Sequence, residues 1–163
     1  MRVVVADSGP LHYLVLIRKI DVLPKLFDGV AVPEAVVGEL RHERTPAAVR
    51  AWASTPPAWL AVHADPAEPL LLPPLDPGER AAIALALALG AELLLVDDRA
   101  GTAAARDQGL ETVGTIGVLK LAAKRRLIDL PTAFAALRAT NFYHPPALLD
   151  ALLAEDRQRR GKP

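Results

Sequence analysis

Aspartates stand at the ends of two strongly apolar segments of this sequence. Residues 2–6 lead into Asp7, and residues 92–96 lead into the adjacent pair Asp97 and Asp98. Both segments read as buried strands, and neighbouring parallel strands would bring these carboxylates together at one edge of a sheet. Their repulsion would be severe in a partly buried crevice unless a cation offset it. Because Mg²⁺ and Mn²⁺ prefer carboxylate and water oxygens, the pattern predicts a divalent metal site.

Helix capping is the alternative explanation of the same aspartates. An aspartate after a strand is a common helix N-cap. Asp7 precedes a turn that begins at Ser8, and Asp98 precedes a helical pattern over residues 99–108. For either strand end taken alone, helix capping and metal binding explain the aspartate equally well. The presence of two such ends, one with a doubled acid, favours the metal.

Composition restricts the ligands of such a metal to oxygen. The chain has no cysteine, which excludes disulfides, thiolate metal sites and a cysteine nucleophile. Its four histidines are scattered, and no two have the spacing that places imidazoles on one metal. With 19 basic and 19 acidic residues the net charge is zero. A nucleic-acid substrate would therefore need a local basic patch.

The motifs of three other enzyme classes are missing. No Gly-x-x-x-x-Gly-Lys-Ser/Thr segment is present, which excludes a P-loop enzyme. Ser8 and Ser54 are the only serines, and neither lies in the Gly-x-Ser-x-Gly turn of a serine hydrolase. A phosphoryl-acceptor domain would carry its paired acids at the first strand, whereas the doublet here follows a late strand.

The chain length and its apolar segments indicate one soluble domain. We expect the 163 residues to fold as a single domain, residues 1–163. The longest apolar segment, residues 81–91, falls well short of the roughly 18 apolar residues that a membrane-spanning helix needs. The opening MRVVVADSGP lacks the pattern of a signal peptide. These features predict a cytoplasmic protein without a membrane segment.

Strand and helix signals alternate along the chain. Apolar, β-branched runs predict strands at residues 2–6, 30–32, 59–63, 92–96 and 111–113. Capping and proline signals predict the helices, with Asp21, Thr45, Asp76 and Thr115 among the expected N-caps. The helices are expected over residues 8–17, from 21, and over 33–40, 45–53, 76–89, 99–108, 115–125, 131–139 and about 146–160. The proline-dense ADPAEPLLLPPLDPGE reads as a loop. This order predicts an α/β fold whose mostly parallel sheet is covered on both faces.

The order of the acidic positions resembles that of the PIN-domain family along nearly the whole chain. The matching segments are VVVADSGPLHYLVLI, VPEAVVGEL, LDPGERAAIALALALGAELLLVDDRAGTAAARDQGLETVGTIGVL and AKRRLIDL. The sequence looks like the VapC-like branch found in small prokaryotic toxin–antitoxin ribonucleases. The resemblance implies a three-layer α/β/α sandwich and metal-dependent hydrolysis of phosphodiester bonds in RNA.

The resemblance also implies a set of metal ligands and catalytic carboxylates. By position these fall on Asp7, Glu39, Glu79 and one of Asp97 and Asp98. The sequence has Val-Asp-Asp in place of the commoner Thr-x-Asp, so the primary ligand of the doublet stays open. Asp7 and one doublet aspartate would bind Mg²⁺ or Mn²⁺ directly, with the glutamates as further or water-mediated ligands. Without the resemblance, Glu39 reads as a solvated helix residue and Glu79 as favourable first-turn charge.

Three further residues are candidate contacts to the substrate. Ser8 occupies a small hydroxyl position after the first aspartate of the family, Arg99 follows the doublet, and Thr115 matches a family position without an assigned role. Arg99 alternatively pairs with Asp98. The cations at residues 124–126 fit a helix C-terminus better than a phosphate site. Aromatic residues make up only 4% of the chain, so base stacking is not expected.

The partners implied by the resemblance are RNA, a small antitoxin protein and a second copy of the chain. The apolar residues 148–153 suit a protein contact, but they equally suit closure of the core, so the C-terminal helix is either peripheral or part of the domain. The alternative function is a non-catalytic PIN-like module that binds RNA or protein without cutting.

Overall fold

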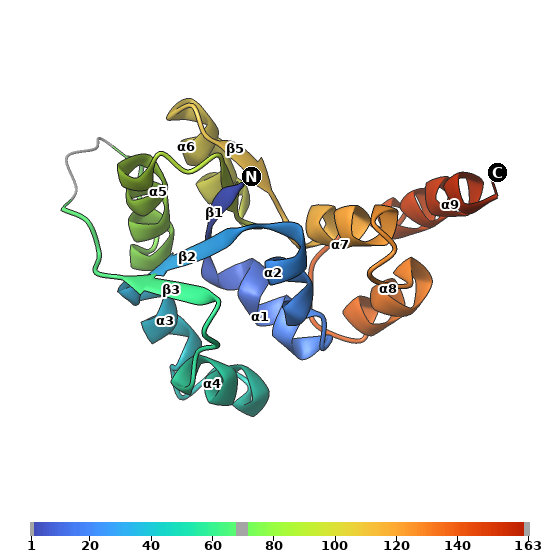
Figure 1. Ribbon diagram of the computed structural model, residues 1–163, viewed down its shortest axis with the longest axis horizontal. Helices are drawn as coiled ribbons and strands as arrows, with labels where there is room; N and C mark the ends of the chain where they lie inside the picture. The colour runs from blue at the N-terminus through green and yellow to red at the C-terminus, as the bar shows by residue number, and fades with distance from the viewer. Residues whose placement is uncertain (1, 68–71, 162–163) are drawn as a thin grey trace.

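A parallel β-sheet forms the centre of the fold (Figure 1). The structure is a computed structural model that describes residues 2–67 and 72–161. In these residues the sheet has five strands: β1 (Val3–Ala6), β2 (Gly29–Pro33), β3 (Leu60–His63), β4 (Leu93–Leu95) and β5 (Glu111–Val113). Every pair of neighbouring strands is parallel, which confirms the predicted α/β class.

Helices connect the strands and extend the chain beyond the sheet. Their bounds are α1 (Ser8–Leu16), the 3₁₀ turn η1 (Ile20–Val22), α2 (Leu23–Leu26), α3 (Glu34–Leu40), α4 (Ala47–Ser54), α5 (Pro77–Leu89), α6 (Arg99–Asp107), α7 (Thr115–Lys124), α8 (Leu130–Arg138) and α9 (Leu148–Arg160). Each predicted helix and strand has a counterpart within a few residues. Part of the predicted proline-dense loop, residues 68–71, lies outside the described residues.

The strand order places β1 and β4 side by side. The order is β3-β2-β1-β4-β5, and Val4 pairs with Leu93 while Ala6 pairs with Leu95. The chain runs from β1 towards β3 on one side and returns to β4 on the other, so the strand order reverses between β1 and β4. The carboxyl edge of a parallel sheet at such a reversal is where ligands bind in open α/β folds.

Right-handed crossovers explain why helices cover both faces of the sheet. The β1–α1–β2 and β3–α5–β4 connections cross the sheet in opposite directions, so they place α1 and α5 on opposite faces. In agreement, α5 packs on β2, β1 and β4 and touches α6, whereas α1 contacts α7 and α4 (Figure 1). The sheet is therefore the middle layer of an α/β/α sandwich.

The two strands that meet at the reversal are buried on both faces. Val4, Val5 and Ala6 of β1 are fully buried, and the residues of β4 are at most 2% exposed. This burial explains why both segments are continuous apolar runs instead of alternating ones. No helix in the described part of the chain is long and apolar enough to cross a membrane.

In the part of the chain that the structure describes, aspartate side chains cap three helices. Each carboxylate accepts a backbone N–H from the first turn: Asp76 from Glu79 at 2.8 Å, Asp98 from Gly101 at 2.9 Å, and Asp129 from Thr132 at 3.1 Å. Asp7 also occupies an N-cap position, before α1, but its side chain makes no capping hydrogen bond. Capping therefore accounts for the position of Asp98 and leaves that of Asp7 unexplained.

The predicted N-caps at Asp21 and Thr45 are wrong. Asp21 lies inside η1, and Val22 occupies the N-cap position of α2. Thr45 does not cap α4, because Pro46 takes that position and the Thr45 hydroxyl donates to the carbonyl of Glu39 at 3.1 Å. These helices begin without a side-chain cap.

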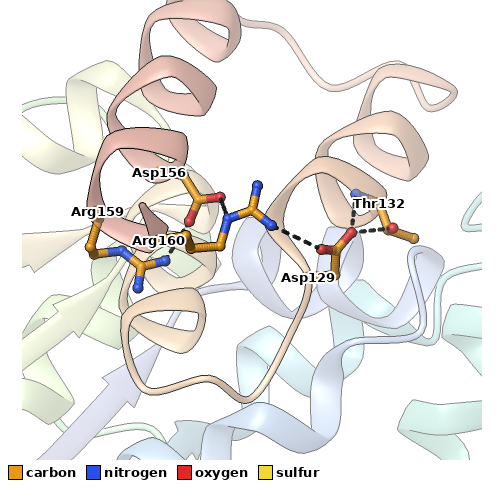
Figure 2. A network of polar contacts seen from close by, with 5 residues as sticks. All are labelled: Asp129, Thr132, Asp156, Arg159 and Arg160. Atoms are coloured by element: carbon orange, nitrogen blue, oxygen red, sulfur yellow. Dashed lines mark hydrogen bonds and ion pairs between the residues drawn. The ribbon is translucent and has the colours of Figure 1, made fainter. Parts of the chain in front are cut away.

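An ion-pair network joins the last turn of α9 to the start of α8 (Figure 2). Asp156, only 5% exposed, pairs with Arg159 and, at 2.9 Å, with Nε of Arg160. Arg160 also lies 3.8 Å from Asp129, whose carboxylate accepts the N–H of Thr132 at the start of α8. One arginine thus connects a buried acid on α9 with the capping acid of α8.

The first turn of α9 is attached to α8 as well. Leu149 is fully buried, and Arg138 donates to Asp150 at 2.7 Å. Because α9 is fixed to α8 near both ends, its apolar residues close part of the core where Leu149 enters it.

Candidate functional site

Asp7 lies at the carboxyl end of β1, where the strand order reverses. Its backbone N–H donates to the carbonyl of Leu95 at 2.8 Å, which fixes it against β4. The side chain is 4% exposed, and within the described residues its Oδ1 has no hydrogen-bond partner. Burial, together with the nearby carboxylates of Asp76, Glu39 and Asp97, raises the pKa of Asp7 from 3.8 to about 7. An unpaired buried carboxylate oxygen is costly unless a ligand satisfies it.

Glu39 reaches this region from α3. Its Oε1 accepts the backbone N–H of Gly78 at 2.9 Å, at the start of α5. Burial raises the pKa of Glu39, while a hydrogen bond from the hydroxyl of Ser8 opposes the shift. A Cβ added at residue 78 would overlap the Glu39 carboxylate, so this close approach needs glycine. Glu39 is thus held by two helix starts and is not a freely solvated residue.

The first turn of α5 contributes two more acids. Glu79 is 7% exposed, and burial, with added repulsion from Asp76 and Asp98, raises its pKa to about 8. Asp76 caps the helix and also raises the pKa of Asp7 and of Glu39. The sequence interpretation assigned Asp76 to capping alone. The Asp-Pro-Gly-Glu pattern satisfies a helix start completely, so it gave no signal for a second role.

Asp97 is positioned by Thr115. The backbone N–H of Thr115 donates to Oδ1 at 2.7 Å, and its hydroxyl donates to Oδ2 at 2.6 Å. Burial raises the pKa of Asp97, and these two hydrogen bonds oppose the shift. The predicted N-cap role of Thr115 is wrong, because Gly114 occupies the N-cap position of α7. Thr115 is fully buried, which favours positioning of Asp97 over direct contact with a substrate.

The two aspartates of the doublet face different neighbours. Asp97 raises the pKa of Asp7, which places it on the β1 side of the site. Asp98 caps α6 and raises the pKa of Glu79 through repulsion and a hydrogen bond. Successive residues of an extended chain point in opposite directions, which explains this division.

The acidic site therefore comprises six carboxylates at one edge of the sheet: Asp7, Glu39, Asp76, Glu79, Asp97 and Asp98. Within the described residues, no three potential ligands lie close enough to hold one ion as they are placed. Most of these acids already accept N–H or O–H groups, yet each carboxylate has further lone pairs for a cation. The donor set, hard oxygens around an unpaired Asp7 Oδ1, fits a divalent cation in its chemistry.

The candidate substrate contacts take different positions. Ser8 is half-buried, and its hydroxyl holds Glu39. Arg99, the first residue of α6, is exposed beside the doublet and makes no ion pair with Asp98 in the described part of the chain. The cations at residues 124–126 lie at the far end of α7 from Thr115, so the acidic site does not include them.

Replacing Thr115 with valine is expected to lower both stability and any activity of the acidic site. The change removes the 2.6 Å hydrogen bond to Asp97 and leaves the backbone bond intact. A hydrogen bond to a charged group contributes about 1.5–3 kcal/mol, and loss of a residue that orients a metal ligand typically costs about 10–100-fold in activity. Urea unfolding and rate measurements check this, with Thr115→Ser as the control that keeps the hydroxyl. Equal behaviour of the two variants would contradict the positioning role.

Comparison with known proteins agrees with this geometry. A family model described as PIN domain matches residues 3–158, which is nearly the whole chain. No curated protein and no solved structure matches the sequence. The resemblance to the PIN-domain family inferred from the acidic positions is confirmed, while the toxin branch stays a prediction. Since the model spans far more than half of the 163 residues, this chain belongs to the PIN-domain family.

Proposed function

We propose that this protein is a Mg²⁺- or Mn²⁺-dependent endoribonuclease that acts as the toxin of a toxin–antitoxin pair. PIN domains are generally nucleases, which supports phosphodiester hydrolysis. One observation carries the metal dependence: Asp7 is buried at the reversal of the strand order, and its Oδ1 has no partner among the residues described. Several carboxylates surround it, so neutralisation by a cation would relieve both the repulsion and the unpaired oxygen.

The chain's own residues divide the work as follows. Asp7 and Asp97 would hold the cation directly, because Asp97 is the doublet aspartate that faces Asp7. Glu39 and Glu79 would act as further or water-mediated ligands, and Thr115 keeps Asp97 in place. Such a cation supplies charge neutralisation at the scissile phosphate and lowers the pKa of bound water. A carboxylate of the acidic site that does not bind the cation would orient or deprotonate the attacking water.

A metal-titrated cleavage assay tests this function. Incubation with a panel of structured and single-stranded RNAs is expected to give cleavage in Mg²⁺ or Mn²⁺ and none in EDTA. Restoring the metal after chelation should restore the activity. Tight binding of RNA or protein without metal-dependent cleavage would contradict the proposal and favour a non-catalytic module.

The proposed partners follow from the toxin role. A small antitoxin protein would silence the enzyme, and a second copy of the chain would form a homodimer. The resemblance to the toxin branch supports both partners, and size measurements with and without the product of a neighbouring gene would test them.

A further inference from the structure

Three of the seven aromatic residues of this chain lie together beside the acidic site. Composition argued against base stacking, but both tyrosines and Phe142 lie beside the acidic site. Tyr13 of α1 packs edge-on against Phe142 with ring centroids 4.9 Å apart, and its hydroxyl donates to Asn141 at 2.9 Å. These contacts attach the segment 141–145, which follows α8, to the helix that begins beside Asp7. We call this segment the aromatic loop.

Tyr143 of the aromatic loop is left uncovered. Its exposed fraction is 80%, and it is the one exposed aromatic residue in the described part of the chain. The tryptophans, by contrast, pack near one another with ring centroids 6.2 Å apart, and Phe27 and Phe134 belong to the core. A single exposed ring needs no explanation by itself. Tyr143 is informative because it lines the same cavities as Asp97 of the acidic site.

Two cavities meet at Tyr143, and both reach Asp97. One, of about 450 Å³, is lined by Tyr13, Asp97, Asp98, Arg99, Phe142 and Tyr143. The other, of about 300 Å³, is lined by Asp97, Arg106, Phe142, Tyr143 and His144, among others. The ring thus stands between two openings that share a proposed metal ligand.

Each opening also carries a cation. Arg99 is exposed in the larger cavity, and Arg106 is exposed in the smaller one, with its Nε donating to Thr112 Oγ1 at 3.1 Å. Guanidinium groups bind phosphate well, and an aromatic face binds any unpaired base by stacking. The two arginines with the ring between them match one unpaired base and the two phosphates that flank its nucleoside in a single strand.

We propose that Tyr143 is a stacking platform for an unpaired base of the RNA substrate, next to the phosphate that is cut. This inference rests on the proposed ribonuclease function and assigns Tyr143 to the binding of an unpaired base. In this arrangement Arg99 and Arg106 contact the phosphates on the two sides of the stacked base. The strand then runs from one cavity to the other, and both cavities are lined by Asp97. The alternative ligand of Tyr143 is a segment of a protein. Measuring RNA binding by variants of Tyr143 distinguishes RNA from protein as the ligand.

The test compares Tyr143→Ala, Tyr143→Phe and Leu89→Ala. Leu89 is 41% exposed at the end of α5, so its variant controls for loss of an exposed apolar side chain. Binding of a labelled single strand of about 12 nucleotides is measured by fluorescence anisotropy in the Asp7→Asn background, where we expect cleavage to be too slow to interfere. We expect Tyr143→Ala to weaken binding about 10-fold, the usual scale for one stacked base, and the other two variants to bind as their parent does. Affinity for a duplex should not change, because its bases are already paired.

Kinetics on the active protein give a second readout. Tyr143→Ala should raise KM for single-stranded RNA by a similar factor and leave kcat nearly unchanged. Unchanged affinity and KM would overturn the stacking platform, and a loss seen equally with duplex would do so too. If RNA binding depends on the ring of Tyr143 but no metal supports cleavage, the proposed ribonuclease function is overturned and the stacking role of Tyr143 stands. Absence of any RNA binding, with dimer or partner binding lost in Tyr143→Ala, would assign the loop to a protein contact.

Discussion

Replacing Asp7 with asparagine is expected to abolish metal-dependent cleavage without weakening the fold. The side chain is 4% exposed and its Oδ1 is unpaired in the described residues, so the change removes a buried charge that the backbone N–H of Ser8 satisfies only in part. Asparagine is nearly isosteric but a much poorer ligand for a hard cation. We expect cleavage to fall by about 100-fold or more, and the unfolding midpoint in EDTA at pH 8 to stay the same or rise.

Asp28→Asn is the matched control for this variant. Asp28 is exposed and precedes β2, at the opposite edge of the sheet from the acidic site. The same chemical change there should leave both cleavage and stability close to those of the parent protein. A folded Asp7→Asn protein that cuts RNA at the parent rate would remove Asp7 from the site, and an unfolded one would show that its carboxylate is structural.

The free energy of unfolding of the metal-free protein is expected to fall as the pH rises from about 6.5 to about 8.5. The pKa of Asp7 is raised from 3.8 to about 7 and that of Glu79 from 4.5 to about 8. The folded protein therefore holds protons that the unfolded chain has already released. Their stabilising contribution is complete below the unfolded pKa values and is lost as the pH passes through the folded ones, a change on the order of 2 kcal/mol.

The interval is chosen to isolate these carboxyl groups. Burial lowers the pKa of His12 from 6.5, so that residue contributes a change of opposite sign, which fades as the pH rises above about 6.5. Urea unfolding followed by circular dichroism in EDTA measures the effect, and Mg²⁺ should diminish it by binding the folded state alone. The double variant Asp7→Asn with Glu79→Gln should flatten the profile. A parent profile that is already flat, or that rises, would contradict proton release from these two carboxyl groups as the cause.

The central part of the fold could be predicted from the sequence because it follows from burial. Two continuous apolar runs predict strands covered on both faces, and the structure pairs them as β1 and β4. Asp7 follows directly, since a residue after a buried strand of a parallel sheet must lie at its carboxyl edge. Glu39 and Glu79 needed the family resemblance, because a helix glutamate has the same local pattern in solvent and in a site.

The features that sequence reasoning missed share a physical cause. Asp76 and Thr115 each fit a familiar local pattern, a helix N-cap, which hides a contact made across the fold. The aromatic loop follows a helix without any periodic pattern, so the packing of Phe142 on Tyr13 depends on tertiary structure alone. A local sequence pattern predicts hydrogen bonds between neighbouring residues of the chain. It carries little information on which residue from a distant part of the sequence contacts the same side chain.

The arginines at the end of α9 set a lower limit on how short the functional chain can be. The family model stops at residue 158, before Arg159 and Arg160, which neutralise the buried Asp156. A protein trimmed to that boundary would keep the acid and lose both of its counter-charges, and it would also lose the link to Asp129 at the start of α8. Removing the residues after 158 would thus weaken the contact between α8 and α9, the two helices that flank the aromatic loop. The effect would reach a loop that lies well before the removed residues in the sequence.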